Sequence, residues 1–299
     1  MANSDKYYVS VIVPTYNRSQ LLDYTLNSIC LQTMDRSNFE VIVSDDGSSD
    51  NTLEVVKKYE DKLNLKYLFQ EDKGYRPASA RNAGITESEG TVCLLVDCGV
   101  LLNVNCLDEH YRFHIEKGRN AIAIGYVYGF DQGDGLFSNL KRLVVPEQPQ
   151  ESIRRISKDK LFYDVREYHY TTYEDRIHDL PAPWLYFWTC HVSIRKEDLL
   201  IVGLFDTIYD GRWGCEDNDL GFRLFLNGGQ FYLLRDAESI HYPHDGDWVS
   251  KVEQGYQNCI LFHNKFQTLE TKVFLDTYKN EIFTDINAIC MRMRLAEKV

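Results

Sequence analysis

The stretch YVSVIVPTYNR, residues 8–18, joins an apolar run to a polar loop and decides the fold class of this chain. The same arrangement returns twice, and the expected strands are Val9–Val13, Phe39–Val43, Leu65–Phe69 and Thr91–Val96. Helical spacing fills the intervals, over Gln20–Leu31, Thr52–Lys62 and Ala78–Ser88. Strands that are apolar on both faces and joined by helices form a parallel sheet covered on both sides. The sequence therefore predicts an α/β protein with a doubly wound parallel first half.

The second half of the chain predicts further strands and a helical tail. Two more strands, Cys190–Ile194 and Phe231–Leu234, flank a helix expected over Asp217–Leu226. Residues 129–183 lose clear periodicity, which predicts an irregular insertion. We expect one domain over residues 1–247 and a helical C-terminal extension over residues 248–299.

Composition narrows the classes of partner and the compartment. The net charge of -12 argues against nucleic acid as a partner, because phosphate backbones are bound by an excess of Lys and Arg. The eight cysteines contain no CxxC pair, so we expect free thiols. No run approaches the roughly 20 apolar residues of a membrane span. These features predict a soluble, cytoplasmic protein without a membrane span.

The loops that follow the strands are the places to look for a ligand. In a doubly wound sheet, ligands bind beyond the carboxyl ends of the strands. These ends carry PTYNR (14–18), SDDGS (44–48) and DCG (97–99). No GxGxxG follows the first strand, which weighs against a dinucleotide site.

Five motifs in order resemble the family-two glycosyltransferases of GT-A fold. They are VIVPTYNR (11–18), SDDGSSD (44–50), KGYR (73–76) with ARNAG (80–84), LVDC (95–98) and WGCEDNDLGFRL (213–224). The last is similar to the acceptor-side motif of chondroitin-type polymerase domains and β-1,4-galactosyltransferases. The resemblance covers roughly residues 8–245. It implies a GT-A mixed sheet with a Rossmann-like first half.

The resemblance also implies an activity. It is that of an inverting hexosyltransferase, which moves a sugar from a nucleotide-sugar, with UDP expected, to an acceptor hydroxyl by direct displacement. The acceptor could be a glycan, a lipid, a peptide or a small molecule, and residues 129–183 are then a candidate acceptor region. A catalytically silent sugar-nucleotide or glycan-binding protein and a nucleotidyltransferase are the alternatives.

The donor-binding residues implied by the resemblance lie on the first three loops. Asp46 is expected to accept a hydrogen bond from the uracil imide, although DDGSSD is also suited to an Asx turn or a helix cap. A diphosphate or ribose is expected at Lys73, Gly74, Arg76 and Arg81. Arg81 could instead be a helix-surface residue that pairs with Glu87 or Asp97. The base would be framed by Pro14, Thr15, Tyr16 and Arg18.

A divalent cation is the expected cofactor, but its usual ligand set is incomplete. The family carries Asp-x-Asp where this chain has Asp97-Cys98-Gly99, so the second carboxylate is missing. Asp97 would hold Mn²⁺ or Mg²⁺ together with His241, or with His244 as the alternative, and with diphosphate oxygens. The missing carboxylate also leaves open a weakly held or dispensable ion.

Inversion requires a general base, and the resemblance assigns it to Asp217 at the start of a helix. Glu216 would orient the acceptor, and Trp213 would belong to a loop that closes over the donor. The competing interpretation is an acidic first turn that is stabilised by the helix dipole, with Trp213 in the core.

Overall fold

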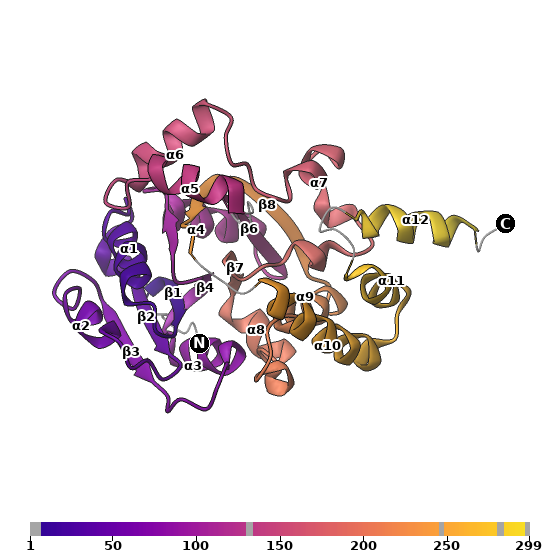
Figure 1. The fold of residues 1–299 in the computed structure, drawn as a ribbon, viewed down its shortest axis with the longest axis horizontal. Coiled ribbons are helices and arrows are strands. Elements are labelled where there is room, and N and C mark those ends of the chain that lie inside the picture. The colour runs from indigo at the N-terminus through magenta and orange to yellow at the C-terminus, as the bar shows by residue number, and fades with distance from the viewer. Residues whose placement is uncertain (1–6, 130–133, 245–247, 280–283, 297–299) are drawn as a thin grey trace.

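A central mixed sheet organises the molecule. The computed structural model describes residues 7–129, 134–244, 248–279 and 284–296. Within these ranges eight strands pair in the order β3-β2-β1-β4-β7-β6-β8-β5, with helices on both sides (Figure 1). Their bounds are Tyr7–Thr15 (β1), Phe39–Asp45 (β2), Leu65–Phe69 (β3), Gly90–Val96 (β4), Val100–Leu102 (β5), Ala121–Tyr128 (β6), His191–Arg195 (β7) and Gln230–His241 (β8).

The first four strands form the parallel half that the sequence predicts. β1 pairs in parallel with both β2 and β4, and β2 pairs in parallel with β3. The connecting helices are α1 (Ser19–Cys30), α2 (Thr52–Lys57) and α3 (Pro77–Glu87). β7 then runs antiparallel to β4 and β6, and β6 runs parallel to β8. The predicted mixed sheet with a parallel first half is therefore confirmed.

Alternate residues of β1 contribute to two different cores. Val11 and Val13 are fully buried in the cluster that contains Leu26 of α1, whereas Ile12 belongs to the cluster that contains Ile85 of α3. Such alternation follows from the two-residue period of a strand. Burial on both faces fixes the register, because a slip of one residue would exchange the two cores.

The segment predicted to be irregular, residues 129–183, is instead largely helical where the structure describes it. It contains α5 (Asp134–Leu143), α6 (Pro149–Lys158) and α7 (Glu167–Thr172). In α6, the buried Ile153 and Ile156 have helical spacing. The helices are short and separated by loops, so no long window of the sequence carries a clear period.

The remaining α-helices come after β5 in the chain. The sequence prediction did not include α4 or the strand β6 that follows it. The bounds of the remaining helices are Cys106–Lys117 (α4), Lys196–Val202 (α8), Glu216–Leu226 (α9), Trp248–Phe266 (α10), Leu269–Thr277 (α11) and Ile286–Ala296 (α12).

The C-terminal residues are helical as predicted, but α10 is part of the main core rather than an appendage. Cys259 and Phe262 are fully buried in the cluster that contains Trp184 and Phe222. The Phe262 ring lies 5.2 Å from that of Trp184 between centroids, in an edge-to-face arrangement. Figure 1 shows α12 projecting from this body toward the C-terminus.

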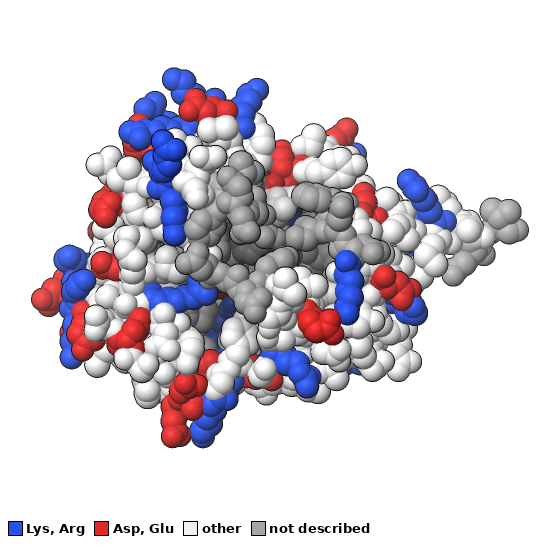
Figure 2. All heavy atoms as spheres, viewed as in Figure 1, with Lys and Arg blue, Asp and Glu red and all other residues white. Residues whose placement is uncertain are grey.

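Basic side chains gather on one part of the surface despite the acidic composition. Figure 2 shows Lys and Arg side chains clustered over the region of α5 and α6. Exposed members of these two helices are Lys141, Arg142, Arg154, Arg155 and Lys158. Among the described residues, no helix combines the length and the apolar character needed to cross a bilayer.

Candidate active site

The loops after β1 and β2 are bound to each other by Asn17. Its backbone adopts a left-handed conformation with φ of 50°. Its side-chain oxygen accepts hydrogen bonds from the amides of Ser49 and Asp50, at 2.8 and 3.2 Å. The backbone N–H of Asn17 donates to the hydroxyl of Ser48 at 2.7 Å. These contacts fix one rim of the site, and the sequence prediction did not assign Asn17 a role.

Two adjacent carboxylates after β2 have different tasks. Asp45 accepts hydrogen bonds from the amides of Gly47 and Ser48, so it makes the Asx turn. Asp46 instead accepts from the amide of Arg76 at 2.7 Å and lies 2.9 Å from the Arg76 guanidinium. Gln70 donates to the same carboxylate at 2.5 Å. Asp46 is therefore free of the turn and faces the loop that leads to α3.

The four residues expected at the diphosphate or ribose do not lie together in the structure. Lys73 is 67% exposed in its side chain and lies 3.6 Å from Glu71. Arg76 pairs with Asp46. Gly74 has a φ of 87°, and a Cβ added there would have no atom within 4 Å. The first-loop residue Tyr16 donates to Asp72 at 2.9 Å. Of the four residues expected at the diphosphate or ribose, Arg81 lies apart from the other three and has partners of its own.

Arg81 connects the end of β4 to the start of α9. Its buried guanidinium lies 2.9 Å from Asp97, 3.3 Å from Glu216 and 3.8 Å from Asp217. The ion pair with Asp97 that the sequence offered as an alternative is thus present, although Arg81 is buried and not on the helix surface. A single cation therefore bridges three carboxylates, one directly after β4 and two in the first turn of α9.

The two carboxylates at the start of α9 differ in their surroundings. Burial raises the pKa of Glu216 to about 7, with a further contribution from Asp217, and Arg81 opposes both. One Glu216 oxygen, Oε2, is buried without a hydrogen-bond partner. Burial also raises the pKa of Asp217, which Arg81 and hydrogen bonds from Thr189 oppose. The Asp217 side chain is 23% exposed, against 8% for Glu216. Asp217 is therefore the more accessible of the two.

The Trp213-Gly214 loop is held by α10. The amide of Trp213 donates to Gln254 at 3.1 Å, and the side chain of Asn258 donates to the carbonyl of Gly214 at 2.8 Å. Trp213 is half-buried, and the ammonium of Lys251 lies 6.0 Å from its ring centroid. This loop precedes Asp217 directly, so α10 helps to set the position of the expected base.

The DCG turn meets both the first loop and the histidine segment. The thiol of Cys98 donates to the carbonyl of Arg18 at 3.7 Å. Gly99 has a φ of 102°, and its carbonyl accepts from the amide of Tyr242 at 2.9 Å. Val100 pairs with His241 across the β5–β8 ladder. Three segments far apart in sequence, all expected at the donor site, are thus adjacent.

The side chains at this turn do not form a complete site for a resident divalent ion. Asp97 shares one oxygen with Arg81, and Gly99 offers no carboxylate. Burial and the neighbouring His244 lower the pKa of His241 to about 3, and the Asp97 carboxylate opposes this shift. Within the described ranges, no group of three or more His, Cys, Asp and Glu side chains could hold a metal. Asp97 and His241 are the two candidate protein ligands that remain, so the other positions around an ion would have to be filled by water or by diphosphate oxygens.

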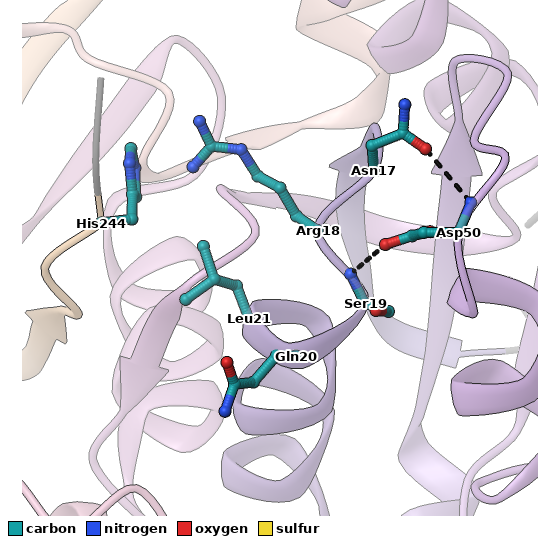
Figure 3. A pocket seen from close by; sticks show the side chains of 7 residues that line it. All are labelled: Asn17, Arg18, Ser19, Gln20, Leu21, Asp50 and His244. Carbon is teal, nitrogen blue, oxygen red and sulfur yellow. Dashed lines mark hydrogen bonds between the residues drawn. The ribbon is translucent and has the colours of Figure 1, made fainter.

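A pocket of about 390 Å³ opens between the first loop and the histidine segment. Figure 3 shows the Arg18 side chain extending toward His244, while Asp50 lies on the other side and binds the amide of Ser19. The pocket is lined by Asn17, Arg18, Ser19, Gln20, Leu21, Asp50 and His244.

Comparison with known proteins finds a family and relatives that agree with the family resemblance described above. The profile described as Glycosyl transferase family 2 matches residues 10–175. Validoxylamine A glucosyltransferase of Streptomyces hygroscopicus subsp. jinggangensis is 36% identical over 97% of this chain and 68% of the relative. Chondroitin synthase of Pasteurella multocida is 33% identical over 78% of this chain and 24% of the relative. Both of these relatives are therefore longer than this chain.

Solved structures share the architecture. The structure of Staphylococcus aureus TarS 1-349 in complex with UDP-GlcNAc superposes with a TM-score of 0.65. It is 21% identical in sequence, and the match covers 97% of this chain and 77% of that chain. At this identity the likeness establishes the fold.

Proposed function

Because this chain belongs to glycosyltransferase family 2, we propose that it is an inverting enzyme that transfers a hexose from a UDP-sugar to an acceptor hydroxyl. The observation that carries the proposal is the Arg81 bridge, which brings Asp97 of the donor edge and Asp217 of the acceptor-side motif to a single guanidinium. A donor held at Asp97 would therefore have its anomeric carbon close to a carboxylate that can act as a base.

Asp46 is the proposed reader of the uracil. Its carboxylate lies at the end of β2 and is held by Arg76 and Gln70, so it accepts hydrogen bonds in a fixed direction. A carboxylate can accept from the imide N–H of uracil. The names of the relatives support UDP-glucose and UDP-GlcNAc as the first donors to test.

Asp217 is the proposed general base. The acceptor oxygen would attack the anomeric carbon while its proton passes to the Asp217 carboxylate, and the bond to the UDP oxygen would break with its electron pair leaving on UDP. The raised pKa of Asp217 suits this task, because a stronger base takes the proton more readily. The partnerless Oε2 of Glu216 supports the proposal that this carboxylate accepts a hydrogen bond from the acceptor.

The proposed location is the cytoplasm. All eight cysteines are free thiols in the structure, which agrees with a reducing compartment. The family resemblance implies Mn²⁺ or Mg²⁺ at Asp97 and His241, but Gly99 supplies no carboxylate there, so the proposed mechanism has no step that requires the ion.

A screen of nucleotide-sugars by thermal shift, with and without Mn²⁺, tests the donor. A specific donor should raise the melting temperature by linkage. The stabilising donor is then incubated with candidate acceptors, and released UDP and the anomeric configuration of the product are measured. Stabilisation without UDP release or transfer would favour a silent binding protein. Formation of a nucleotide-sugar from a nucleoside triphosphate and a sugar phosphate would favour a nucleotidyltransferase.

A further inference from the structure

We propose that Arg18, assisted by Lys251 and His244, binds the diphosphate of the donor, so that this enzyme binds UDP without a divalent cation. The inference rests on the proposed function and concerns the same site. It begins from the incomplete set of metal ligands at the DCG turn, where Gly99 stands in place of a carboxylate. A site that binds a diphosphate without a metal must supply positive charge from its own side chains.

Arg18 lies beside that turn. Its carbonyl accepts a hydrogen bond from the Cys98 thiol, so its backbone is adjacent to the residue that precedes Gly99. Its side chain extends across the pocket toward His244 (Figure 3). The HYPH segment that carries His244 is bound to the turn through Tyr242 and Gly99. A Cβ added at Gly99 would meet the side chain of Leu21, and Leu21 lines the same pocket as Arg18.

Arg18 differs from the other arginines of this edge in its partners. Arg76 is paired with Asp46, and Arg81 is shared among three carboxylates. In the described part of the chain, no carboxylate lies within ion-pair distance of the Arg18 guanidinium. Asp50 lines the same pocket, but it is held by Ser19 and Thr52 on the other side. In a chain with a net charge of -12, an arginine without a carboxylate partner in a pocket is suited to a phosphate.

Lys251 brings a second positive charge from α10. Its ammonium lies over the Trp213 ring, on the loop that leads to Asp217. If the Trp213 loop closes over the donor, Lys251 would bring its charge toward the diphosphate together with that loop.

Calorimetric titration of the full chain with UDP and with uridine, in EDTA and in Mn²⁺, tests the proposal. In EDTA we expect UDP to bind with an affinity within about threefold of that in Mn²⁺. Arg18→Ala should weaken UDP binding by about 10-fold to 100-fold, because it removes hydrogen bonds to a charged group, and should leave uridine binding unchanged. Arg18→Lys should recover part of the loss. Arg112→Ala, which removes an exposed arginine of α4, is the charge-matched control.

Two results would overturn the inference alone. One is the loss of UDP binding in EDTA with recovery in Mn²⁺. The other is an Arg18→Ala variant, folded by circular dichroism, whose UDP affinity is unchanged or whose uridine affinity falls as much as its UDP affinity. Failure of the unmodified protein to bind UDP in either buffer would contradict the proposed function itself.

Discussion

Thr189 holds both carboxylate oxygens of Asp217. Its backbone amide donates to one oxygen at 3.0 Å, and its hydroxyl donates to the other at 2.8 Å. Thr189 lies just before β7, while Asp217 belongs to the first turn of α9. The contact therefore orients the carboxylate of the proposed base next to the start of β7. The Arg81 guanidinium lies 3.8 Å from the same carboxylate.

Asp217→Asn should reduce turnover by roughly 10²–10⁴-fold, the usual effect of losing a general base. The substitution keeps the shape of the side chain and removes its basicity. Donor affinity, measured by calorimetry, should remain nearly unchanged. Glu216→Gln should cause a smaller fall in turnover together with weaker acceptor binding. If Glu216→Gln is inactive while Asp217→Asn is active, the two roles are reversed, and if both are active the base lies elsewhere.

Thr189→Val should move the acidic limb of the pH–rate profile to higher pH. The hydroxyl of Thr189 lowers the pKa of Asp217, so its removal raises that pKa and protonates the base at a higher pH. The expected movement is about one pH unit, the equivalent of one hydrogen bond to a charged group. Thr189→Ser keeps the hydroxyl and should restore the original profile. An unshifted profile in Thr189→Val would show that the contact has only a structural role.

Asp46→Asn should weaken UDP binding while the protein remains folded. The amide keeps the size of the side chain but has no charge and only one acceptor oxygen, for which Gln70, Arg76 and the uracil imide would compete. We expect a loss of about 10-fold or more in calorimetry. Asp61→Asn, on the exposed surface, provides the matched control. Equal UDP affinities for the two variants would remove Asp46 from the site.

Gly99→Ala should destabilise the fold by about 1 kcal/mol or more, measured by urea denaturation, because a φ of 102° is unfavourable for a residue with a Cβ. Gly99→Asp carries the same strain and also returns the missing carboxylate. We expect it to tighten Mn²⁺ binding in the presence of UDP. If Gly99→Asp gains no Mn²⁺ affinity over Gly99→Ala, the DCG turn does not face the diphosphate.

A buried histidine network makes stability sensitive to acid. His110 lies between Ser193 and His191, and His114 also bonds to Ser193, with all four side chains buried. Burial lowers the pKa of His114 and of His191 to about 3, and lowers that of His110 as well. These histidines are therefore neutral in the folded protein and must gain protons on unfolding below their ordinary pKa.

Stability should accordingly fall as the pH drops from about 6.5 toward 3, by up to about 1.4 kcal/mol per pH unit for each histidine. Above pH 6.5 this contribution should be fully present. Urea denaturation at a series of pH values measures it, and His114→Gln should flatten the dependence. His178→Gln, at a partly exposed histidine, serves as the control. The same slope in the two variants would show that His114 is not a source of the acid sensitivity.

The sequence by itself determined the parallel half of the sheet and the identity of the motifs. Runs such as Val9–Val13 are apolar on both faces, and local periodicity is enough to predict strands of this kind. Because parallel strands end at the same edge of a sheet, the loops after β1, β2 and β4 could be placed together from the order of the elements. The run Ala121–Tyr128 is also apolar throughout, and its composition could have revealed β6.

The tertiary structure alone decided which charges meet at that edge. Arg81 was expected at the diphosphate or ribose, yet its guanidinium is buried against Glu216, 135 positions away in the chain. Thr189 carried no signal, because a threonine before a strand is commonplace and its partner lies on a different helix. The assignment of α10 to the core also depended on packing that no local pattern reports. Local periodicity records burial, whereas ion pairing depends on distances between side chains, and these exist only once the chain has folded.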